Sequence, residues 1–329
     1  MPGAERLAVP VVLIGFNRPD FSRKVFAEIR RARPGKLLLV TDGPRPGRAL
    51  EAERVAAVRD LAREVDWDCE VLCNYPEKNL GIPTRFATAF QWIFENVEEA
   101  IILEHDCLPH PDFFTFCAAL LERYRDDPRI AWIGGTNAMR RWPADGSPGQ
   151  GSYLFNRINM VWGWATWRRA WRHYDISCRA FPAFERSGEL SRVTRHREIR
   201  RGFAAVMDLA AQGLWENWDV QSTFLIWSQR ALAIHPRVNL VSNIGFDAEA
   251  ANTKWTSDPL ANLPTEPLGP LVHPRSVEPD DDFDLACFRA HYRWMRRIAV
   301  FRQLRKLPFY PASRQLYRRF THLTAGRPG

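Results

Sequence analysis

The chain has 329 residues, of which 46% are hydrophobic and 26% charged, a globular composition that excludes a disordered chain. Its net charge of +8 arises after residue 286, which excludes a nucleic-acid surface spread over a whole domain. No run of about 18 apolar residues offers a membrane span, and the first ten residues lack the apolar region of a secretory signal, so we expect a cytoplasmic protein.

The first 135 residues alternate strand-like and helix-like patterns. Apolar runs bounded by turn residues predict strands at 9–16, 36–41, 69–74, 100–103 and 130–133. Apolar residues at helical spacing predict helices at 21–31, 51–65, 85–96 and 111–124. Strands that alternate with helices predict an α/β fold with a mostly parallel sheet covered on both faces.

Polar segments follow four of these strands, at 16–18, 42–43, 104–106 and 134–137. We expect them along one edge of the sheet, because parallel strands end at the same edge and ligands bind there. Neither GxGxxG nor GxxxxGK[ST] follows any strand, which excludes a dinucleotide fingerprint and a P-loop. A bound nucleotide would therefore be held by other means.

The pattern changes beyond residue 140. Residues 142–151 are rich in Pro and Gly and predict a surface loop, whereas Trp164, Trp167 and Trp171 recur at helical spacing. Further patterns predict helices at 195–212 and 219–229, a strand pair at 231–235 and 238–241, and a surface-wrapping segment at 256–283.

The triplet Glu104-His105-Asp106 carries the clearest chemical signal. Two carboxylates at the end of a buried strand are hard oxygen ligands that suit Mg²⁺ or Mn²⁺, and such a metal can neutralise a departing diphosphate. The alternative is that two acids simply end a strand in solvent. The short loop before the next predicted helix fixes their direction and favours the metal, with the ring of His105 on the other face.

Seven segments together resemble the GT-A fold, family 2-like nucleotide-sugar glycosyltransferases. The chain is similar in pattern to bacterial glycosyltransferase-like proteins and to the eukaryotic N-glycan-branching and O-mannose-extending N-acetylglucosaminyltransferases. The segments are VVLIGFNR (11–18), VTDG (40–43), NLG (79–81), ILEHDCLPHPDFF (102–114), VWGWATWRRAW (161–171), ENWDVQSTF (216–224) and NLVSNIGF (239–246). The resemblance implies a GT-A (Rossmann-like) sheet flanked by helices.

The resemblance also implies a set of residues that hold the donor and the metal. Asp106 would coordinate Mn²⁺ or Mg²⁺, and Glu104 would contact the ribose or a metal-bound water. Asp42 is equally explained as a turn-capping residue, and the segment 79–81 as a plain helix start. A His that similar proteins carry is replaced by Asn252, with Asp247 as the nearby substitute. The donor-binding residues would be Phe16, Asn17, Arg18, Asp42, Asn79, Gly81, Arg85, Glu104 and His105.

Catalysis requires a carboxylate that takes a proton from the acceptor hydroxyl. The resemblance assigns this role to Asp219, with Glu216 as the fallback, although Asp219 also suits a helix N-cap. Trp162, Trp164 and Asn137 would form the wall for the acceptor and the donor sugar, whereas Trp167 and Trp171 are expected in the core.

The C-terminal part is basic. Residues 287–329 hold eleven Lys and Arg and no Asp or Glu, so the preceding residues carry a net charge of −3. The tail is equally explained as a helix packed on the body and as a contact with anionic lipid headgroups. We expect a catalytic domain at 1–255, divided into a nucleotide-sugar-binding half at 1–140 and an acceptor half at 141–255, then a surface-wrapping linker at 256–286 and a basic helical tail at 287–329.

Together these features predict a metal-dependent, inverting hexosyl- or N-acetylhexosaminyltransferase. It would use a nucleotide-diphosphate sugar, with UDP favoured, and a glycan or lipid-linked acceptor, without a nucleic-acid partner, in the cytoplasm or peripherally on the inner face of the membrane. One alternative is a non-catalytic glycan- or membrane-binding module of the same fold. A sugar nucleotidyltransferase is disfavoured because 16–19 is not a Gly-rich loop.

Overall fold

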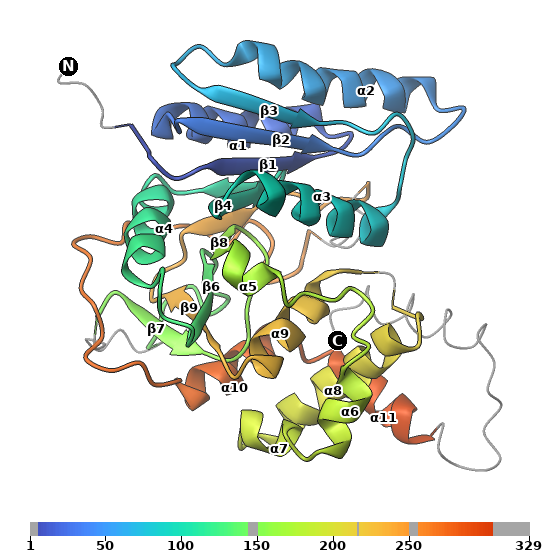
Figure 1. Ribbon diagram of the computed structural model, residues 1–329, viewed down its shortest axis with the longest axis vertical. Coiled ribbons are helices and arrows are strands. Elements are labelled where there is room, and N and C mark those ends of the chain that lie inside the picture. Colours follow the sequence, from blue (N-terminus) through green and yellow to red (C-terminus); the bar gives the residue numbers. More distant parts are fainter. Residues whose placement is uncertain (1–5, 144–150, 216, 250–255, 305–329) are drawn as a thin grey trace.

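A central eight-stranded sheet organises the molecule (Figure 1). The computed structural model describes residues 6–143, 151–215, 217–249 and 256–304. In spatial order the strands are β3 (Glu70–Asn74), β2 (Lys36–Thr41), β1 (Val11–Gly15), β4 (Glu99–Glu104), β8 (Trp164–Trp167), β6 (Ile130–Gly134), β9 (Leu232–Pro236) and β7 (Tyr153–Asn156).

Most strands of this sheet run in the same direction. β3, β2, β1 and β4 pair in parallel, and β8 lies antiparallel between β4 and β6. β9 is parallel to β6, and β7 closes the other edge antiparallel to β9. The predicted α/β class with a mostly parallel, helix-covered sheet is confirmed, and the arrangement is consistent with a GT-A-like fold. A small antiparallel pair joins β5 (Cys107–Pro109) to β10 (Val241–Asn243).

Helices cover both faces of the sheet because alternate residues of its inner strands point to opposite sides. In β1, Val12 and Ile14 belong to one apolar core, whereas Val11 and Leu13 belong to the other. The long helices of these cores are α1 (Pro19–Ala32), α2 (Ala49–Arg59), α3 (Ile82–Asn96), α4 (Asp112–Arg123), α8 (Arg197–Ala211) and α9 (Asp219–Ser228). The first core includes α3, α8 and α9, and the second includes α1 and α4.

Shorter helices complete the structure. A 3₁₀ turn, Asp60–Glu64, continues α2, and three short helices precede α8: α5 (Arg168–Trp171), α6 (Phe181–Arg186) and α7 (Leu190–Val193). At the C-terminal side lie α10 (Asp281–His291) and α11 (Met295–Leu304). No helix among these residues is long and apolar enough to cross a membrane.

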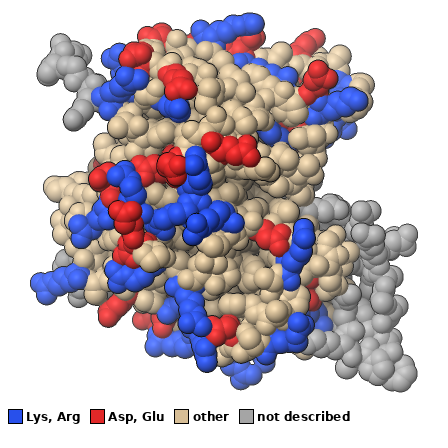
Figure 2. Space-filling model, in the orientation of Figure 1, with Lys and Arg blue, Asp and Glu red and all other residues tan. Residues whose placement is uncertain are grey.

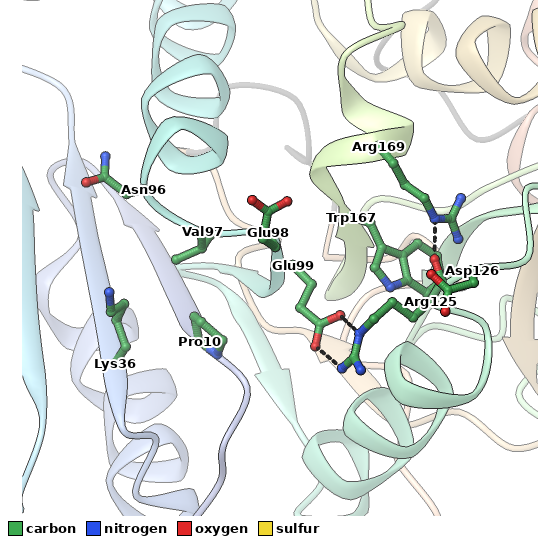
Figure 3. A pocket seen from close by; sticks show the side chains of 10 residues that line it. All are labelled: Pro10, Lys36, Asn96, Val97, Glu98, Glu99, Arg125, Asp126, Trp167 and Arg169. Atoms are coloured by element: carbon green, nitrogen blue, oxygen red, sulfur yellow. Dashed lines mark hydrogen bonds and ion pairs between the residues drawn. The ribbon is translucent and has the colours of Figure 1, made fainter.

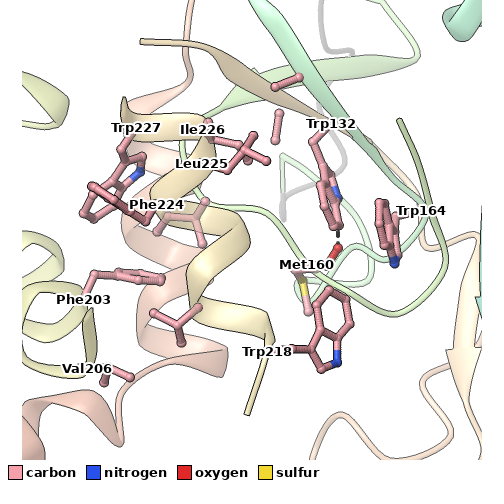
Figure 4. Packing of buried hydrophobic residues seen from close by; sticks show 14 of the residues in the cluster. Trp132, Met160, Trp164, Phe203, Val206, Trp218, Phe224, Leu225, Ile226 and Trp227 are labelled. Carbon is pink, nitrogen blue, oxygen red and sulfur yellow. Dashed lines mark hydrogen bonds between the residues drawn. The ribbon is translucent and has the colours of Figure 1, made fainter. Parts of the chain in front are cut away.

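Two predictions of local structure are wrong. Trp164 and Trp167 lie in the strand β8, not on a helix, and the ring of Trp164 stacks on Trp132 with centroids 3.8 Å apart (Figure 4). The predicted strand pair near 231–241 does not form, because β9 inserts between β6 and β7 while β10 pairs with β5. In both cases distant pairing partners, rather than local spacing, decide the outcome.

The beginning of the basic tail is part of the folded body. The expected boundary after residue 286 falls inside α10, and α11 packs against α8 (Figure 1). Arg289 pairs with Glu198 at 2.8 Å, and Arg302 pairs with Glu185 at 2.6 Å. The packed-helix interpretation therefore holds through residue 304, and residues 305–329 lie outside the part that the structure describes.

Candidate functional site

The acidic triplet lies at the edge where the parallel strands end. Glu104 is the last residue of β4, and β5 begins at Cys107, so His105 and Asp106 form the link between the two strands. The backbone N–H of His105 donates to the carbonyl of Ile14 at 2.8 Å. The N–H of Ile244 donates to the carbonyl of Asp106 at 2.9 Å. The triplet is therefore held between β1 and the loop after β10.

The fold brings a third carboxylate close to this triplet. Asp219 is the first residue of α9, and its Oδ1 accepts the N–H of Val220 at 2.9 Å. Burial raises the pKa of Glu104 well above its ordinary value, and the negative charges of Asp106 and Asp219 raise it further. Burial likewise raises the pKa of Asp219, although the Val220 N–H opposes the shift. The charges of Asp106 and Asp219 thus both act on Glu104, and residues 104, 106 and 219 are here called the acidic cluster.

This acidic cluster fits a divalent cation by its chemistry. Among the residues that the structure describes, Glu104, Asp106 and Asp219 form no ion pair with Lys, Arg or His. Repelling carboxylates without a basic partner are the oxygen donors that Mg²⁺ and Mn²⁺ take. However, no group of three or more His, Cys, Asp or Glu side chains within the described ranges has an arrangement that could hold a metal ion, so the three carboxylates do not form a metal site by themselves. Substrate oxygens or water would have to complete the coordination.

One arginine stands beside the acidic cluster. Arg18 follows β1, forms an ion pair with Asp247, and lies over the ring of Phe21 at 4.6 Å. The pKa of the His105 imidazole is lowered by burial, while Asp106 and Asp247 raise it and Arg18 lowers it. Thus His105 lies near both Asp106 and the Arg18–Asp247 pair. Asp247, the expected substitute metal ligand, is engaged by Arg18.

Asp42 fixes a loop rather than facing an open site. Its Oδ1 accepts the N–H of Gly43 at 2.8 Å and that of Leu80 at 2.9 Å. Its Oδ2 accepts the N–H of Gly81 and the side-chain amide of Asn79, both at 3.0 Å. Four donors from the protein therefore occupy its two oxygens, which supports the interpretation of Asp42 as a turn-capping residue. Three of these donors belong to the segment 79–81, so Asp42 also holds this second segment in place.

Arg85 lies buried below this loop, on the first turn of α3. Its Nη2 donates to the carbonyl of Asn74 at 2.9 Å, and its Nε has no hydrogen-bond partner among the described residues. Burial lowers the pKa of Arg85 to about 10, and the charge of Asp42 opposes the shift. A buried cation with an unused donor can accept an anion, but only 4% of this residue is exposed.

Sequence reasoning missed one further buried carboxylate, Glu51, which lies near the residues that follow β1. Glu51, on α2, accepts the backbone N–H of Arg45 at 2.8 Å and the amide of Asn17 at 3.2 Å. The hydrogen bond from the Arg45 side chain is the main cause that lowers the pKa of Glu51 to about 2. The Arg45 guanidinium also lies 5.8 Å from the ring centre of Phe16. Glu51 thereby orients the side chain of Asn17, at the end of β1.

Only part of the predicted acceptor wall faces solvent. Trp162 is half-buried and meets Phe246 edge-on at 5.7 Å. Trp164 and Asn137 are fully buried, so their assignment to that wall is corrected. Trp164 packs among aromatic rings, and the amide of Asn137 donates to the carbonyl of Pro236 at 3.0 Å. Glu216 and Asn252 lie outside the described residues.

A hollow of about 610 Å³ lies at the amino ends of the parallel strands, away from the acidic cluster (Figure 3). Its lining includes Pro10, Lys36 and Glu99, which lie just before or at the starts of β1, β2 and β4. Glu99 and Arg125 both line the hollow and form an ion pair with each other at 3.0 Å. The acidic cluster lies at the other ends of these strands, so this hollow is separate from the candidate site.

No protein-family model and no curated protein sequence matches the chain. Among solved structures, it is similar to the mannosyltransferase PcManGT from Pyrobaculum calidifontis in complex with GDP-Man and Mn²⁺, with 14% identity, a TM-score of 0.39, and 69% of this chain and 70% of that chain covered. It is also similar to a UDP-glucose pyrophosphorylase complexed with UDP-glucose, with 8% identity, a TM-score of 0.38, and 72% and 93% covered. A third similar structure is 4-diphosphocytidyl-2C-methyl-D-erythritol synthase from Anaerococcus prevotii, with 8% identity, a TM-score of 0.37, and 71% and 92% covered. Likeness of this degree does not bear on activity or substrate, which are argued below from the site.

Proposed function

We propose that the chain is a nucleotide-sugar-dependent, inverting glycosyltransferase. The observation that carries this proposal is the acidic cluster of Glu104, Asp106 and Asp219 at the carboxyl edge of the sheet. Two of its carboxylates come from the end of β4, and the third comes from the start of α9. One edge thus offers oxygen ligands for a cation and a separate carboxylate for proton transfer.

In the proposed reaction, Asp219 accepts the proton of an acceptor hydroxyl. The oxygen attacks the anomeric carbon of the donor sugar as the bond from that carbon to the diphosphate breaks, so the configuration inverts. Burial raises the pKa of Asp219 towards the range that suits a base, while the Val220 N–H keeps the carboxylate available. Asp219 is therefore suited to take the proton.

Asp106 would hold the divalent metal, with Glu104 beside it on the donor side. When bound, Mn²⁺ or Mg²⁺ would neutralise the charge that develops on the departing diphosphate. Arg18 would approach the same phosphates after exchanging its ion pair with Asp247 for one with the donor. The favoured donor is a UDP-sugar, and the acceptor is a glycan or a lipid-linked sugar.

The proposal is tested by measuring donor binding and nucleotide release with and without metal. UDP- and GDP-linked sugars should raise Tm in the presence of Mn²⁺, and the increase should disappear with a chelator. Asp106→Asn should lose this metal-dependent increase while keeping or raising Tm without metal, because one repelling carboxylate is removed. The matched control is Asp68→Asn, since the side chain of Asp68 is 91% exposed and remote from the cluster.

Three results would contradict the proposal. If no nucleotide sugar releases its nucleotide in a metal-dependent way, the chain is not such an enzyme. If Asp106→Asn binds Mn²⁺ and donor as well as the natural chain, the metal is held elsewhere. Formation of a nucleotide sugar from a nucleoside triphosphate and a sugar phosphate would instead identify a nucleotidyltransferase.

A further inference from the structure

Two pairs of aromatic side chains lie near the start of α9, and one member of each pair comes from the C-terminal region: His291 ends α10, and Trp294 lies in the turn before α11. We propose that Trp162, Trp215, His291 and Trp294, here called the aromatic platform, bind a pyranose ring of the acceptor. The proposal rests on the proposed function and names the chemistry of its second substrate. It also assigns residues of the basic C-terminal region to a substrate site.

The platform consists of two pairs of rings in contact. Trp215 and Trp294 lie parallel, 6° apart, with ring centres separated by 5.7 Å. His291 meets Trp162 edge-on at 5.1 Å, and two residues separate it from Trp294 along the chain. All four side chains are half-buried, so each is packed on one side and keeps some surface exposed to solvent.

The platform adjoins the proposed base. Trp215 lies four residues before Asp219 along the chain, and Asp219 is the first residue of α9. Tyr292, between His291 and Trp294, donates its hydroxyl to the carbonyl of Asn159 at 2.8 Å. The side-chain amide of Asn159 donates to the hydroxyl of Ser222, which in turn donates to the carbonyl of Asp219. A ring seated on the platform would therefore lie within reach of Asp219.

A sugar ring is the ligand that matches these features. One face of a pyranose is rich in C–H groups and packs on aromatic rings, while its hydroxyls need hydrogen-bond partners. Among the residues that the structure describes, the Nε1 of Trp215 has no hydrogen-bond partner, and the carboxylate of Asp219 can accept hydrogen bonds. A phosphate-rich lipid surface fits less well, because the nearby Arg289 and Arg296 both pair with Glu198.

The test is disaccharide binding, measured by saturation-transfer NMR and by tryptophan fluorescence. The probes are maltose, cellobiose and N,N′-diacetylchitobiose, added to the full chain and to Trp294→Ala. We expect at least one probe to bind, and Trp294→Ala to weaken its binding about tenfold. Trp294→Phe should restore most of the affinity because it keeps an aromatic face. The matched control is Trp92→Ala, since Trp92 is half-buried on α3, away from the platform.

The possible results separate this inference from the proposed function. Absence of binding by all three disaccharides, or equal binding by Trp294→Ala in a folded protein, would overturn the platform. Binding to phosphatidylglycerol vesicles that Trp294→Ala abolishes, without sugar binding, would make it a membrane contact instead. Sugar binding without any donor binding would uphold the platform and reject the glycosyltransferase.

Discussion

Asp219 occupies a position where two opposing effects act on one carboxylate. Burial raises its pKa, whereas the start of α9 and the Val220 N–H stabilise its charged form. The helix begins at Asp219 itself, so this residue is in the first turn and does not precede the helix as an N-cap. The net effect raises the pKa of Asp219, which makes its carboxylate a stronger base than that of an exposed Asp.

Asp219→Asn should abolish sugar transfer while leaving donor binding intact. Loss of a positioned base costs about 10²–10⁴-fold in rate. Because the base acts deprotonated and its pKa is raised, kcat/KM of the natural chain should fall on the acidic side at a higher pH than the ordinary Asp value of about 3.9. Donor affinity from titration and a pH profile of kcat/KM check both points.

The control for this prediction is Glu216→Gln, which changes the other candidate base. We expect it to keep most of the transfer activity. If Asp219→Asn turns over normally and Glu216→Gln does not, the base is Glu216. An unchanged acidic limb in Asp219→Asn would also exclude Asp219 as the titrating group.

Residues with local patterns could be predicted from the sequence, whereas those set by distant contacts could not. Asp106 and Asp219 each follow or begin a strongly patterned element, so their positions at the sheet edge were predictable. Glu51 looks like an ordinary helix-surface acid, and only its contacts with Arg45 and Asn17 reveal its role. Trp164 was misassigned because a Trp that lines a sugar site and one that fills a core have the same local sequence.

Among the elements, the loop after β10 has the closest contact with the proposed metal ligand. The backbone of Gly245 approaches the Asp106 carboxylate so closely that an added Cβ would lie 2.3 Å from Oδ2. Two ion pairs tie the same loop to the donor side, Arg18 with Asp247 and Arg54 with Glu249. This loop therefore constrains both the orientation of Asp106 and the anionic partner of Arg18.

Gly245→Ala should displace the Asp106 carboxylate and weaken metal-dependent donor binding. Overpacking of this kind costs about 1–3 kcal/mol, because backbone and carboxylate must both move. In a double-mutant cycle scored by the Mn²⁺-dependent rise in Tm, Gly245→Ala should add little once Asp106 is already Asn. Additive effects would show that Gly245 acts independently of Asp106.

Gly35→Ala is the matched control for that substitution. Its new Cβ would also make a close contact, at 2.8 Å, but with the guanidinium of Arg6, whose flexible side chain can move away. We expect Gly35→Ala to leave metal-dependent stabilisation unchanged. The comparison separates the cost of an added methyl group from an effect on Asp106.

Strand and helix types followed the local pattern wherever an element was long and buried. The strand β2 has the predicted bounds, and α9 differs from its prediction by one residue at its end. β8 has only four residues, and its Trp spacing also fits a helix, so its pairing with β4 and β6 was not predictable. Short elements gain their stability from neighbours that local sequence does not reveal.

At the scale of the molecule, part of the positive charge of the C-terminal region lies on helices that are packed into the fold. One apolar core extends from Val12 in β1 to Phe301 in α11. Arginines of α10 and α11 pair with acids of α6 and α8, namely Glu185, Glu198 and Asp208. On the face in Figure 2, basic and acidic side chains lie interspersed. The C-terminal helices thus contribute both to stability and, through the aromatic platform, to the proposed acceptor site.

Phe283→Ala should destabilise the whole molecule, because α10 belongs to the shared core. Phe283 is fully buried, and its ring centre lies 5.6 Å from those of both Trp142 and His235. Truncating such a side chain costs about 3–5 kcal/mol, whereas Val300→Ala, at a 60% exposed position of α11, should change stability by less than about 0.5 kcal/mol. Urea unfolding followed by circular dichroism and tryptophan fluorescence should give coincident transitions that shift together in Phe283→Ala. An early, separate loss of helix signal in that variant, with the remaining transition unshifted, would show instead that the C-terminal helices fold as an independent appendage.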